Sequence, residues 1–559
     1  MSSTSKSFEI SKYLVPFLVY ALSTFASILA FPPFDVSELA FVFISPFVFW
    51  VFFNPSFKQY WITSACFSVS SWCGLLIWLR NIGDYVHTGG PFIGYSALIL
   101  LATLVGCFYF VWLLAVYWVI PRMKTKKALH RMFAVLGLAG LWVVLEWVKT
   151  FFLYGFPWLP LSVSQWKNPA ILQIAAWTGG YGISFLLILF NITIPLFIRH
   201  ITSRNVRLKN NGRFLKRLCP EFYFTLGCLL LAIMVFVRSW PAKQIQAEAF
   251  EVCVIQPNIP QLVKWDIDEA TRNWSQLNDE TLKSLTDEDE RPLPELFLWP
   301  EAITPTAVDD DPVMRQLVEE TVDRLDRPIL MGNLSFRDNR IYNGIFVVEP
   351  EVGLKKEFYA KRKLVPFGEF IPLRKYIPFG KNIFTGWDVT SGDRPGILEV
   401  NMKHRSRPKD FPMVTFKAGT LVCYEDVFPN LARETVKAGA DFLFVATNNS
   451  WFGEEGAAYQ HAAHSVLRAV ETRRPVIRCG NAGWSGWIDE FGMIRDVLEE
   501  DGTIYTKGYK TMKISRYLKY LTSKSFYVQH GDWFIFICAF FAIRCFVIFR
   551  KIIPDGSGY

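Results

Sequence analysis

Charged residues are scarce in this chain: only 19% of its 559 residues are Asp, Glu, Lys or Arg, whereas 51% are hydrophobic. A soluble domain usually carries about a quarter charged residues, so the deficit indicates that part of the chain lies in lipid. The length allows two units with separate cores. The sequence also lacks an internal repeat, a P-loop and a GxGxxG motif. Nothing in it therefore supports nucleotide binding.

The ten cysteines form no CxxC pair and show no metal-ligand spacing. Six lie in apolar runs, where a thiol usually packs as a small hydrophobic group. Cys219 lies in a basic loop, which leaves Cys253, Cys423 and Cys479 for the large polar region. Three is an odd number, so at least one of these thiols is free or pairs outside the chain. We expect no metal ion and no other cofactor. The six cysteines in apolar runs are Cys66, Cys73, Cys107, Cys228, Cys538 and Cys545.

Eight apolar stretches flank the polar region. Several are long enough to cross about 30 Å of hydrocarbon as a helix, whereas the second, fifth, seventh and eighth are short. For the first, an uncleaved span fits better than a signal peptide, because its apolar run is long and its small-x-small site is poor. The sequence thus predicts a polytopic α-helical membrane domain of about eight transmembrane helices. The stretches are Tyr13–Ala30, Leu39–Phe53, Trp61–Leu79, Phe92–Ile120, Met132–Val148, Ile171–Ile198, Phe222–Val237 and Trp533–Phe549.

Basic residues alternate between the loops that join these stretches. Arg122–Arg131 holds five Lys or Arg and Arg199–Arg217 holds seven, whereas Phe31–Glu38 holds none. Arg80–Gly90 holds one and Lys149–Ala170 holds two. Because basic loops stay in the cytoplasm, we predict a cytoplasmic N-terminus and an external polar region. The net charge of +9 then reflects membrane topology, and we expect no nucleic-acid partner.

The polar region alternates strand-like and helix-like segments. Helix-like stretches such as Asp311–Asp326 and Ala457–Glu471 lie between short β-rich runs, an alternation that predicts an α/β layered domain. We therefore expect a membrane domain at 1–239, an α/β domain at 240–525, and a last span with a short cytoplasmic tail at 526–559. The β-rich runs are Phe250–Gln256, Glu295–Trp299, Pro328–Met331, Tyr342–Val348, Gly419–Val422, Asp441–Ala446 and Val476–Cys479.

Three reactive side chains stand just beyond predicted strands. They are Glu301, Lys361 and Cys423, and the carboxyl ends of strands are where α/β sheets gather catalytic groups. Each has an ordinary explanation when taken alone: a helix-start carboxylate, a solvated basic cluster, a buried structural thiol. Together in one domain they favour a cysteine nucleophile with a carboxylate as base and a lysine that stabilises an oxyanion.

These segments resemble the apolipoprotein N-acyltransferase family of the nitrilase superfamily. The matching strings are Trp-Pro-Glu ending at Glu301, Tyr-x-Lys-x-x-Leu-Val-Pro-Phe-Gly-Glu around Lys361, and Cys-Tyr-Glu at Cys423. Lys361 is preferred over Lys363 because it lies three residues before Leu364, as the family's lysine does.

Four further strings match the same family. They are Gln-Pro-Asn-Ile-Pro-Gln from Gln256, Lys-Trp at 264–265, Trp-Phe-Gly from Trp451 and Gly-Phe-Pro-Trp-Leu from Gly155. The resemblance covers nearly the whole chain. Two segments depart from the family pattern and bear on substrate preference: Asn448–Ser450, where Asn-Asp is expected, and Asn481–Trp484.

The resemblance implies both a fold and a reaction. The α/β domain is expected to be a nitrilase-like αββα sandwich, with Glu301, Lys361 and Cys423 as catalytic triad. The implied reaction passes through a thioester acyl-enzyme with ping-pong kinetics, from a membrane phospholipid to the α-amine of a diacylglyceryl-modified apolipoprotein. The implied location is the bacterial inner membrane, with the catalytic domain on the periplasmic side. The implied supporting or substrate-binding residues are Glu369, Tyr424, Glu425, Trp265, Trp451, Asn258 and Asn448.

Other interpretations use some of the same residues. Cys423 with His461 or His464 would make a cysteine protease, and the two histidines at i,i+3 spacing would suit a metal, although two histidines on a helix are usually structural. A membrane-tethered amidase or nitrilase would use the same triad and pass the acyl group to water. A lipoprotein-binding protein without activity is disfavoured by the intact Glu-Lys-Cys set. The seven preceding spans favour acyl transfer, because a soluble amidase does not need them.

Overall fold

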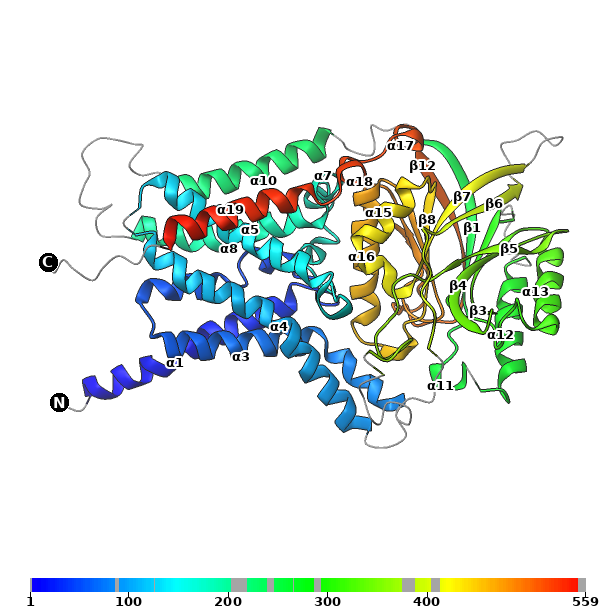
Figure 1. Ribbon diagram of the computed structural model, residues 1–559, viewed down its shortest axis with the longest axis horizontal. Coiled ribbons are helices and arrows are strands. Elements are labelled where there is room, and N and C mark those ends of the chain that lie inside the picture. The colour runs from blue at the N-terminus through cyan, green and yellow to red at the C-terminus, as the bar shows by residue number, and fades with distance from the viewer. Residues whose placement is uncertain are drawn as a thin grey trace. The chain divides into compact units, whose positions relative to one another are not determined.

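The chain folds into two compact units in a computed structural model (Figure 1). The helical unit comprises Met1–Arg238 and Asp532–Tyr559, and the α/β unit comprises Ser239–Gly531. Trp265 and most of the second basic loop lie outside the residues that the structure describes. The described residues are 3–85, 90–124, 126–202, 219–238, 246–264, 266–285, 293–372, 374, 388–403 and 413–550.

The helical unit is built from long apolar helices joined by short helical turns. The long helices are α1 (Ser3–Leu29), α3 (Phe57–Leu75), α4 (Gly90–Arg122), α5 (Ala128–Lys149), α8 (Gly180–Thr202), α10 (Pro220–Arg238) and α19 (Trp533–Phe549). The shorter elements are η1 (Ser37–Phe41), α2 (Ser45–Trp50), η2 (Val51–Phe53), η3 (Ile77–Tyr85), η4 (Phe152–Tyr154), η5 (Leu161–Gln165), α6 (Pro169–Leu172) and α7 (Ala175–Thr178).

Among the described residues, five helices are long and apolar enough to cross a membrane, or six if the bent pair α3–η3 forms one span. The first predicted stretch corresponds to a shorter apolar segment of α1, Tyr13–Leu29. Two stretches are less regular than we predicted. The second is broken into η1, α2 and η2 and ends where Asn54 takes a left-handed φ of 51°. The sixth is interrupted before α8 by Gly179, which has a φ of 67°.

Glycines let two helices of this unit approach closely. A Cβ added at Gly140 of α5 would meet the main-chain oxygen of Cys538, and one added at Gly137 would come within 2.8 Å of the Phe541 oxygen. Both neighbours belong to α19. Small residues at such contacts are how helices in lipid gain packing energy, because the lipid tails give them no hydrophobic drive to associate. The C-terminal helix is therefore packed against α5 despite 383 intervening residues between Lys149 and Trp533.

The α/β unit contains two six-stranded sheets with the orders β12-β1-β2-β3-β4-β5 and β11-β10-β9-β8-β7-β6. Parallel pairing holds the centre of each sheet, β1-β2-β3 in the first and β7-β8-β9 in the second, while the remaining pairs are antiparallel. The first sheet consists of β1 (Gln246–Gln256), β2 (Leu296–Trp299), β3 (Ile329–Arg337), β4 (Arg340–Glu349), β5 (Gly353–Ala360) and β12 (Gly508–Tyr517). The second consists of β6 (Ile397–Lys403), β7 (Met413–Val422), β8 (Phe442–Thr447), β9 (Val476–Gly480), β10 (Gly486–Ile488) and β11 (Ile494–Val497).

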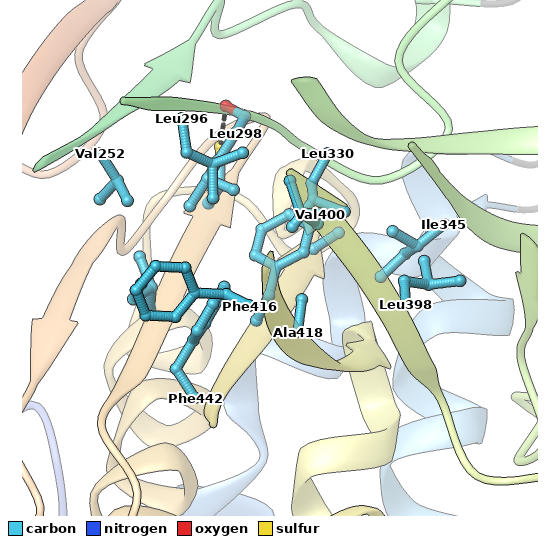
Figure 2. Packing of buried hydrophobic residues seen from close by; sticks show 14 of the residues in the cluster. Val252, Leu296, Leu298, Leu330, Ile345, Leu398, Val400, Phe416, Ala418 and Phe442 are labelled. Carbon is cyan, nitrogen blue, oxygen red and sulfur yellow. Dashed lines mark hydrogen bonds between the residues drawn. The ribbon is translucent and has the colours of Figure 1, made fainter. Parts of the chain in front are cut away.

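The main hydrophobic core lies between the two sheets. Figure 2 shows Val252 and Leu298 of the first sheet meeting Phe416 and Phe442 of the second. The Cys479 thiol belongs to this core and donates to the main-chain oxygen of Leu298 at 3.1 Å. A strand buried on both faces reads as a continuous apolar run, which is how the central strands of both sheets appear in the sequence.

Helices cover the outer faces of the sheets (Figure 1). On the first sheet, residues that alternate with the core residues, such as Phe297 and Trp299, pack against Leu277 and Val318 of two covering helices. On the second, the missing side chain of Gly419 leaves room for Thr435. The result is the predicted αββα sandwich. The covering helices are α12 (Ala270–Lys283) and α13 (Pro312–Leu325) on the first sheet, and α15 (Pro429–Lys437) and α16 (Ala457–Thr472) on the second; the short helices α11 (Gln261–Lys264), α17 (Leu518–Thr522) and α18 (Phe526–His530) complete the unit.

Candidate active site

Three strand ends carry the three predicted catalytic side chains. Glu301 is separated from the end of β2 by one residue, whereas Lys361 directly follows β5 and Cys423 directly follows β7. The first two strands belong to one sheet and the third to the other. The side chains therefore come from both layers of the sandwich, and the core between the sheets holds their main chains in place.

The Lys361 ammonium lies between two carboxylates. Its Nζ is 2.9 Å from Oε1 of Glu369 and 3.4 Å from Oε1 of Glu301, and the residue is 1% exposed. Burial acts to lower the pKa of Lys361, but the charges of Glu369, Glu301 and Cys423 outweigh it and hold that pKa well above its usual range. Lys361 is thus a fixed positive charge that can face a developing oxyanion.

Asn343 of β4 joins the same two carboxylates, and sequence reasoning missed it. Its Nδ2 donates to Oε1 of Glu301 and to Oε1 of Glu369, each at 2.8 Å. Its main-chain oxygen accepts a 2.8 Å hydrogen bond from the amide of Lys361. The only signal in the sequence was a lone amide side chain inside an apolar β-run, and buried amides of this kind need partners. Asn343 orients the acid–lysine pair from a rigid strand.

Cys423 begins the short helical turn η9 (Cys423–Val427) with a left-handed φ of 49°. A non-glycine residue in that region is strained, and such strain gathers at functional sites. Removal of the half-buried thiol from water raises the pKa of Cys423 to about 12, and the charge of Glu301 adds to that rise. Lys361 acts in the opposite direction. The positive charge of Lys361 is therefore outweighed by burial and by Glu301, which favour the thiol form of Cys423.

The loop after β8 reaches the same thiol. The Thr447 side chain and the main-chain amide of Asn448 both act to lower the pKa of Cys423. A main-chain N–H in this position is the kind of donor that stabilises a thiolate or an oxyanion. Asn448 thus reaches the nucleophile through its main chain.

Glu425 ties the turn of the nucleophile to the lysine loop. Its Oε1 accepts from the amides of Arg362 at 2.7 Å and Lys363 at 3.1 Å, and its Oε2 accepts from the amide of Val422 at 2.8 Å. The Tyr359 hydroxyl lies 2.8 Å from both oxygens. The residue is fully buried, and burial is the main cause that raises its pKa. Glu425 therefore ties the segment that follows β5 to the end of β7.

Tyr424, next to the nucleophile, packs its ring edge-on against Phe428 at a centroid distance of 5.1 Å. It is 8% exposed, and burial raises its pKa above the usual range. Its described contact is thus one of packing.

A second buried network lies behind the nucleophile. Nε2 of His461 is 2.8 Å from Oδ1 of Asp426 and 3.0 Å from the main-chain oxygen of Cys423, and its Nδ1 is 3.2 Å from Nδ2 of Asn449. Burial opposes ionisation of Asp426, but His461 and Arg478 hold its pKa below the usual range. Both nitrogens of His461 therefore have partners, and Nε2 holds the main chain at Cys423. Across the described residues, no three His, Cys, Asp or Glu side chains gather as a metal site would require.

Comparisons with known proteins cover both units. The family model for the apolipoprotein N-acyltransferase N-terminal domain matches residues 23–193, and the carbon-nitrogen hydrolase model matches residues 251–513. An apolipoprotein N-acyltransferase from Geobacter metallireducens is 27% identical over 96% of this chain and 95% of its own length. This chain belongs to the apolipoprotein N-acyltransferase family.

A further N-acyltransferase and a solved amidase structure are similar over shorter parts of the chain. An apolipoprotein N-acyltransferase from Thermotoga maritima is 25% identical over 86% of this chain and 78% of its own length. A solved amidase from Nesterenkonia sp. AN1 is 13% identical, with a TM-score of 0.36, and covers 50% of this chain and 94% of its own. A similarity that low carries no argument about the reaction.

Two of the remaining residues that the N-acyltransferase resemblance pointed to, Asn258 and Asn448, lie on loops that follow β1 and β8. Nδ2 of Asn448 donates to Oε1 of Gln261 at 2.7 Å, and the amide of Asn258 donates to the main-chain oxygen of Asn481 at 2.7 Å. Trp451 is 37% exposed, and Trp265 lies outside the described residues. The structure thus gives Asn448 and Asn258 roles within a loop network and leaves Trp451 at the surface.

Asn481 is the centre of that network, and the sequence marked it only as a departure from the N-acyltransferase pattern. Its Nδ2 donates to the main-chain oxygen of Ile259 at 2.7 Å and to Oγ of Ser450 at 3.0 Å, and it lies 3.2 Å from Oδ1 of Asn448. Its Oδ1 accepts from the amide of Ile259 at 3.1 Å. One buried amide therefore joins the loops that follow β1, β8 and β9.

Proposed function

We propose that this chain transfers an acyl group from a membrane phospholipid to the α-amine of the N-terminal S-diacylglyceryl-cysteine of an apolipoprotein. Cys423 is the nucleophile, Glu301 the general base and Lys361 the oxyanion donor. The observation that carries the proposal is the single cluster formed by these three groups at the ends of β2, β5 and β7. The family membership supplies the donor and acceptor classes.

The first half-reaction begins with the proton on sulfur. Because the pKa of Cys423 is raised to about 12, the thiolate has to be generated by a base, and Glu301 is the carboxylate whose charge acts on that thiol. The thiolate attacks the ester carbonyl of the phospholipid, and the oxyanion forms against Lys361. The lysophospholipid leaves with the proton from Glu301, and the acyl group remains on Cys423 as a thioester.

The second half-reaction transfers that acyl group to nitrogen. The amine of the acceptor loses a proton to Glu301 and attacks the thioester carbonyl, again against Lys361. Collapse of the intermediate releases the Cys423 thiolate, which regains a proton, and forms the amide. Two sequential transfers at one nucleophile give ping-pong kinetics. We place the enzyme in the bacterial inner membrane, with the α/β unit on the periplasmic side.

Mass spectrometry of the purified full-length protein mixed with phospholipid tests the nucleophile. We expect a mass increase of one acyl chain, located on the peptide that contains Cys423. Cys423→Ala should abolish the adduct, and Cys479→Ala, which removes a buried core thiol, should leave it. An adduct that persists in Cys423→Ala would contradict the assignment. Absence of an adduct with hydrolysis of simple amides would favour a membrane-tethered amidase.

A further inference from the structure

Lys264 is a buried lysine beside the site that the reaction above does not use. It ends α11 and is 4% exposed, and its ammonium donates a 2.9 Å hydrogen bond to the main-chain oxygen of Glu301. Within the described part of the α/β unit, Lys264 and Lys361 are the lysines that the fold buries. Lysine is almost never fully buried without a compensating interaction, so two at one site call for a common explanation.

Lys264 holds the turn that presents Glu301. The next residue, Ala302, takes a left-handed φ of 46°, and the amide of Ile303 donates to the oxygen of Gly332 at 3.0 Å. A Cβ added at Gly332 would come within 2.6 Å of the Glu301 Cα. The turn is therefore packed against β3 on one side, and the Lys264 ammonium binds the main-chain oxygen of Glu301.

The ammonium also lies within electrostatic reach of both reacting groups. Burial lowers the pKa of Lys264 to about 8, whereas the charges of Glu301 and Cys423 act to raise it. These two groups come from separate elements, the turn after β2 and the start of η9. Because electrostatic interaction is mutual, the charge of the Lys264 ammonium also acts on Glu301 and Cys423.

The charges around Lys361 do not balance without a second cation. Glu301 and Glu369 each place an oxygen within 3.4 Å of the Lys361 ammonium, so two carboxylates face one ammonium and the excess is one negative charge. Proton transfer from Cys423 to Glu301 moves this excess onto sulfur without cancelling it. Uncompensated charge is costly in a buried site. The buried carboxyl of Glu425 also interacts with Lys361, so the ammonium of Lys264 offsets negative charge that Lys361 alone does not balance.

We propose that Lys264 is a positioning residue that supplies the second positive charge of the site. It fixes the turn of Glu301 through the main-chain oxygen and stabilises the negative charge as that charge moves from the carboxylate to sulfur. Lys264 itself neither gains nor loses a proton in the step. The inference rests on the proposed function for the identity of the nucleophile, but its test needs neither acyl donor nor acceptor.

The test is the rate at which iodoacetamide alkylates Cys423 in the full-length protein, measured by mass spectrometry of the Cys423 peptide as a function of pH. Lys264→Met keeps an unbranched side chain, one atom shorter, and removes both the charge and the hydrogen bond to the Glu301 oxygen. Because the pKa of Lys264 is about 8, the wild-type charge is present below that pH and lost above it. We expect Lys264→Met to react about tenfold more slowly than wild type near pH 6.5, and this difference to shrink above about pH 9, where only the lost hydrogen bond to Glu301 still separates the two proteins.

Two further variants make the pattern specific. Lys264→Arg stays charged at every pH used, so it should follow the wild type below pH 8 and react faster than the wild type above it. Lys283→Met removes an exposed lysine that pairs with Glu280 and should match the wild type throughout. A rate ratio between Lys264→Met and wild type that is the same at every pH, or equal to one, would overturn the proposal.

The outcome does not depend on the folding of one variant or on the acyl reaction. If Lys264→Met is unfolded by circular dichroism, Lys264→Arg against wild type above pH 8 decides the question, and identical rates there contradict the proposal. If phospholipid forms no adduct on Cys423 while the alkylation pattern is as expected, the proposed function fails and the assignment of Lys264 stands.

Discussion

At the scale of single residues, the site keeps Cys423 protonated until a base acts. Burial raises the pKa of Cys423 to about 12, so the thiol form dominates at neutral pH. A permanently ionised thiolate would be open to oxidation and alkylation. In the proposed mechanism, the buried Glu301, rather than the ammonium of Lys361 alone, controls when the thiolate forms.

Asn343→Leu should slow acyl transfer roughly ten- to a hundredfold. Leucine has nearly the same shape but cannot donate, so Glu301 and Glu369 each lose a hydrogen bond, and bonds to charged groups contribute about 1.5–3 kcal/mol. The measurement is kcat for transfer from phospholipid to a diacylglyceryl-cysteine peptide.

Asn401→Leu is the matched control for that variant. Asn401 also donates to a carboxylate from a strand, 3.1 Å to Glu349, but from β6 and outside the active-site cluster. It should lower the melting temperature and leave kcat unchanged. Equal losses of kcat in the two variants would mean that Asn343 acts only through stability.

The sequence revealed some of these residues and hid others for a physical reason. Glu301, Lys361 and Cys423 stand at strand ends in distinctive strings, so their positions could be predicted. Asn343 could not be predicted, because its function depends on a neighbour across the sheet: its partner Lys361 lies 18 residues away, just after the next strand. The role proposed for Lys264 likewise depends on its contact with the turn of Glu301, which is distant in the sequence.

At the scale of elements, the seven predicted strands are all interior strands of the two sheets. They correspond to β1, β2, β3, β4, β7, β8 and β9.

The strands that were missed include all four sheet edges. These are β5, β6, β11 and β12, with the three-residue β10 beside one of them. Edge strands face solvent on one side and carry charged residues that discourage pairing with other chains. The lysines of β5, Lys355 and Lys356, show this, and they remove the continuous apolar run by which buried strands are recognised.

Gly140→Leu should destabilise the helical unit. A side chain at this position would collide with the main chain of α19 at Cys538, and main chain cannot move aside as a flexible side chain can. We expect a melting temperature in detergent several degrees below that of the wild type.

Gly227→Leu, in α10, is the control for that prediction, because nothing lies within 4 Å of an added Cβ there. Each substitution replaces a helix-disfavouring glycine with leucine. A difference in melting temperature between the two variants therefore reports the packing of α5 on α19. Equal melting temperatures would show that this contact does not stabilise the unit.

At the scale of the whole molecule, family membership rests on similarity across both units. The relative from Geobacter metallireducens is covered almost end to end, and separate family models match the helical and the α/β parts. The combination matters because the Glu-Lys-Cys chemistry alone serves hydrolysis as well as transfer. The match of the helical unit to the N-acyltransferase N-terminal domain is what separates these two possibilities.

The organisation of the chain was more predictable than the number of its membrane spans. The alternation of strands and helices predicted the α/β unit, and apolar runs located each long helix. The count of eight spans remains a prediction beyond the five or six helices that meet the length requirement. Hydropathy alone does not register the breaks at Asn54 and Gly179, where the backbone turns left-handed.

The central claim is that Cys423 carries an acyl group and gives it to an amine. The direct measurement is a chase experiment. The acyl-enzyme is formed with a mass-labelled phospholipid and separated from excess lipid. One half is then incubated in buffer alone and the other half with a diacylglyceryl-cysteine peptide. We predict that the label leaves Cys423 and appears as an amide on the peptide, while it stays on Cys423 in buffer. Release of labelled fatty acid at the same rate in both samples would contradict acyl transfer and identify a hydrolase.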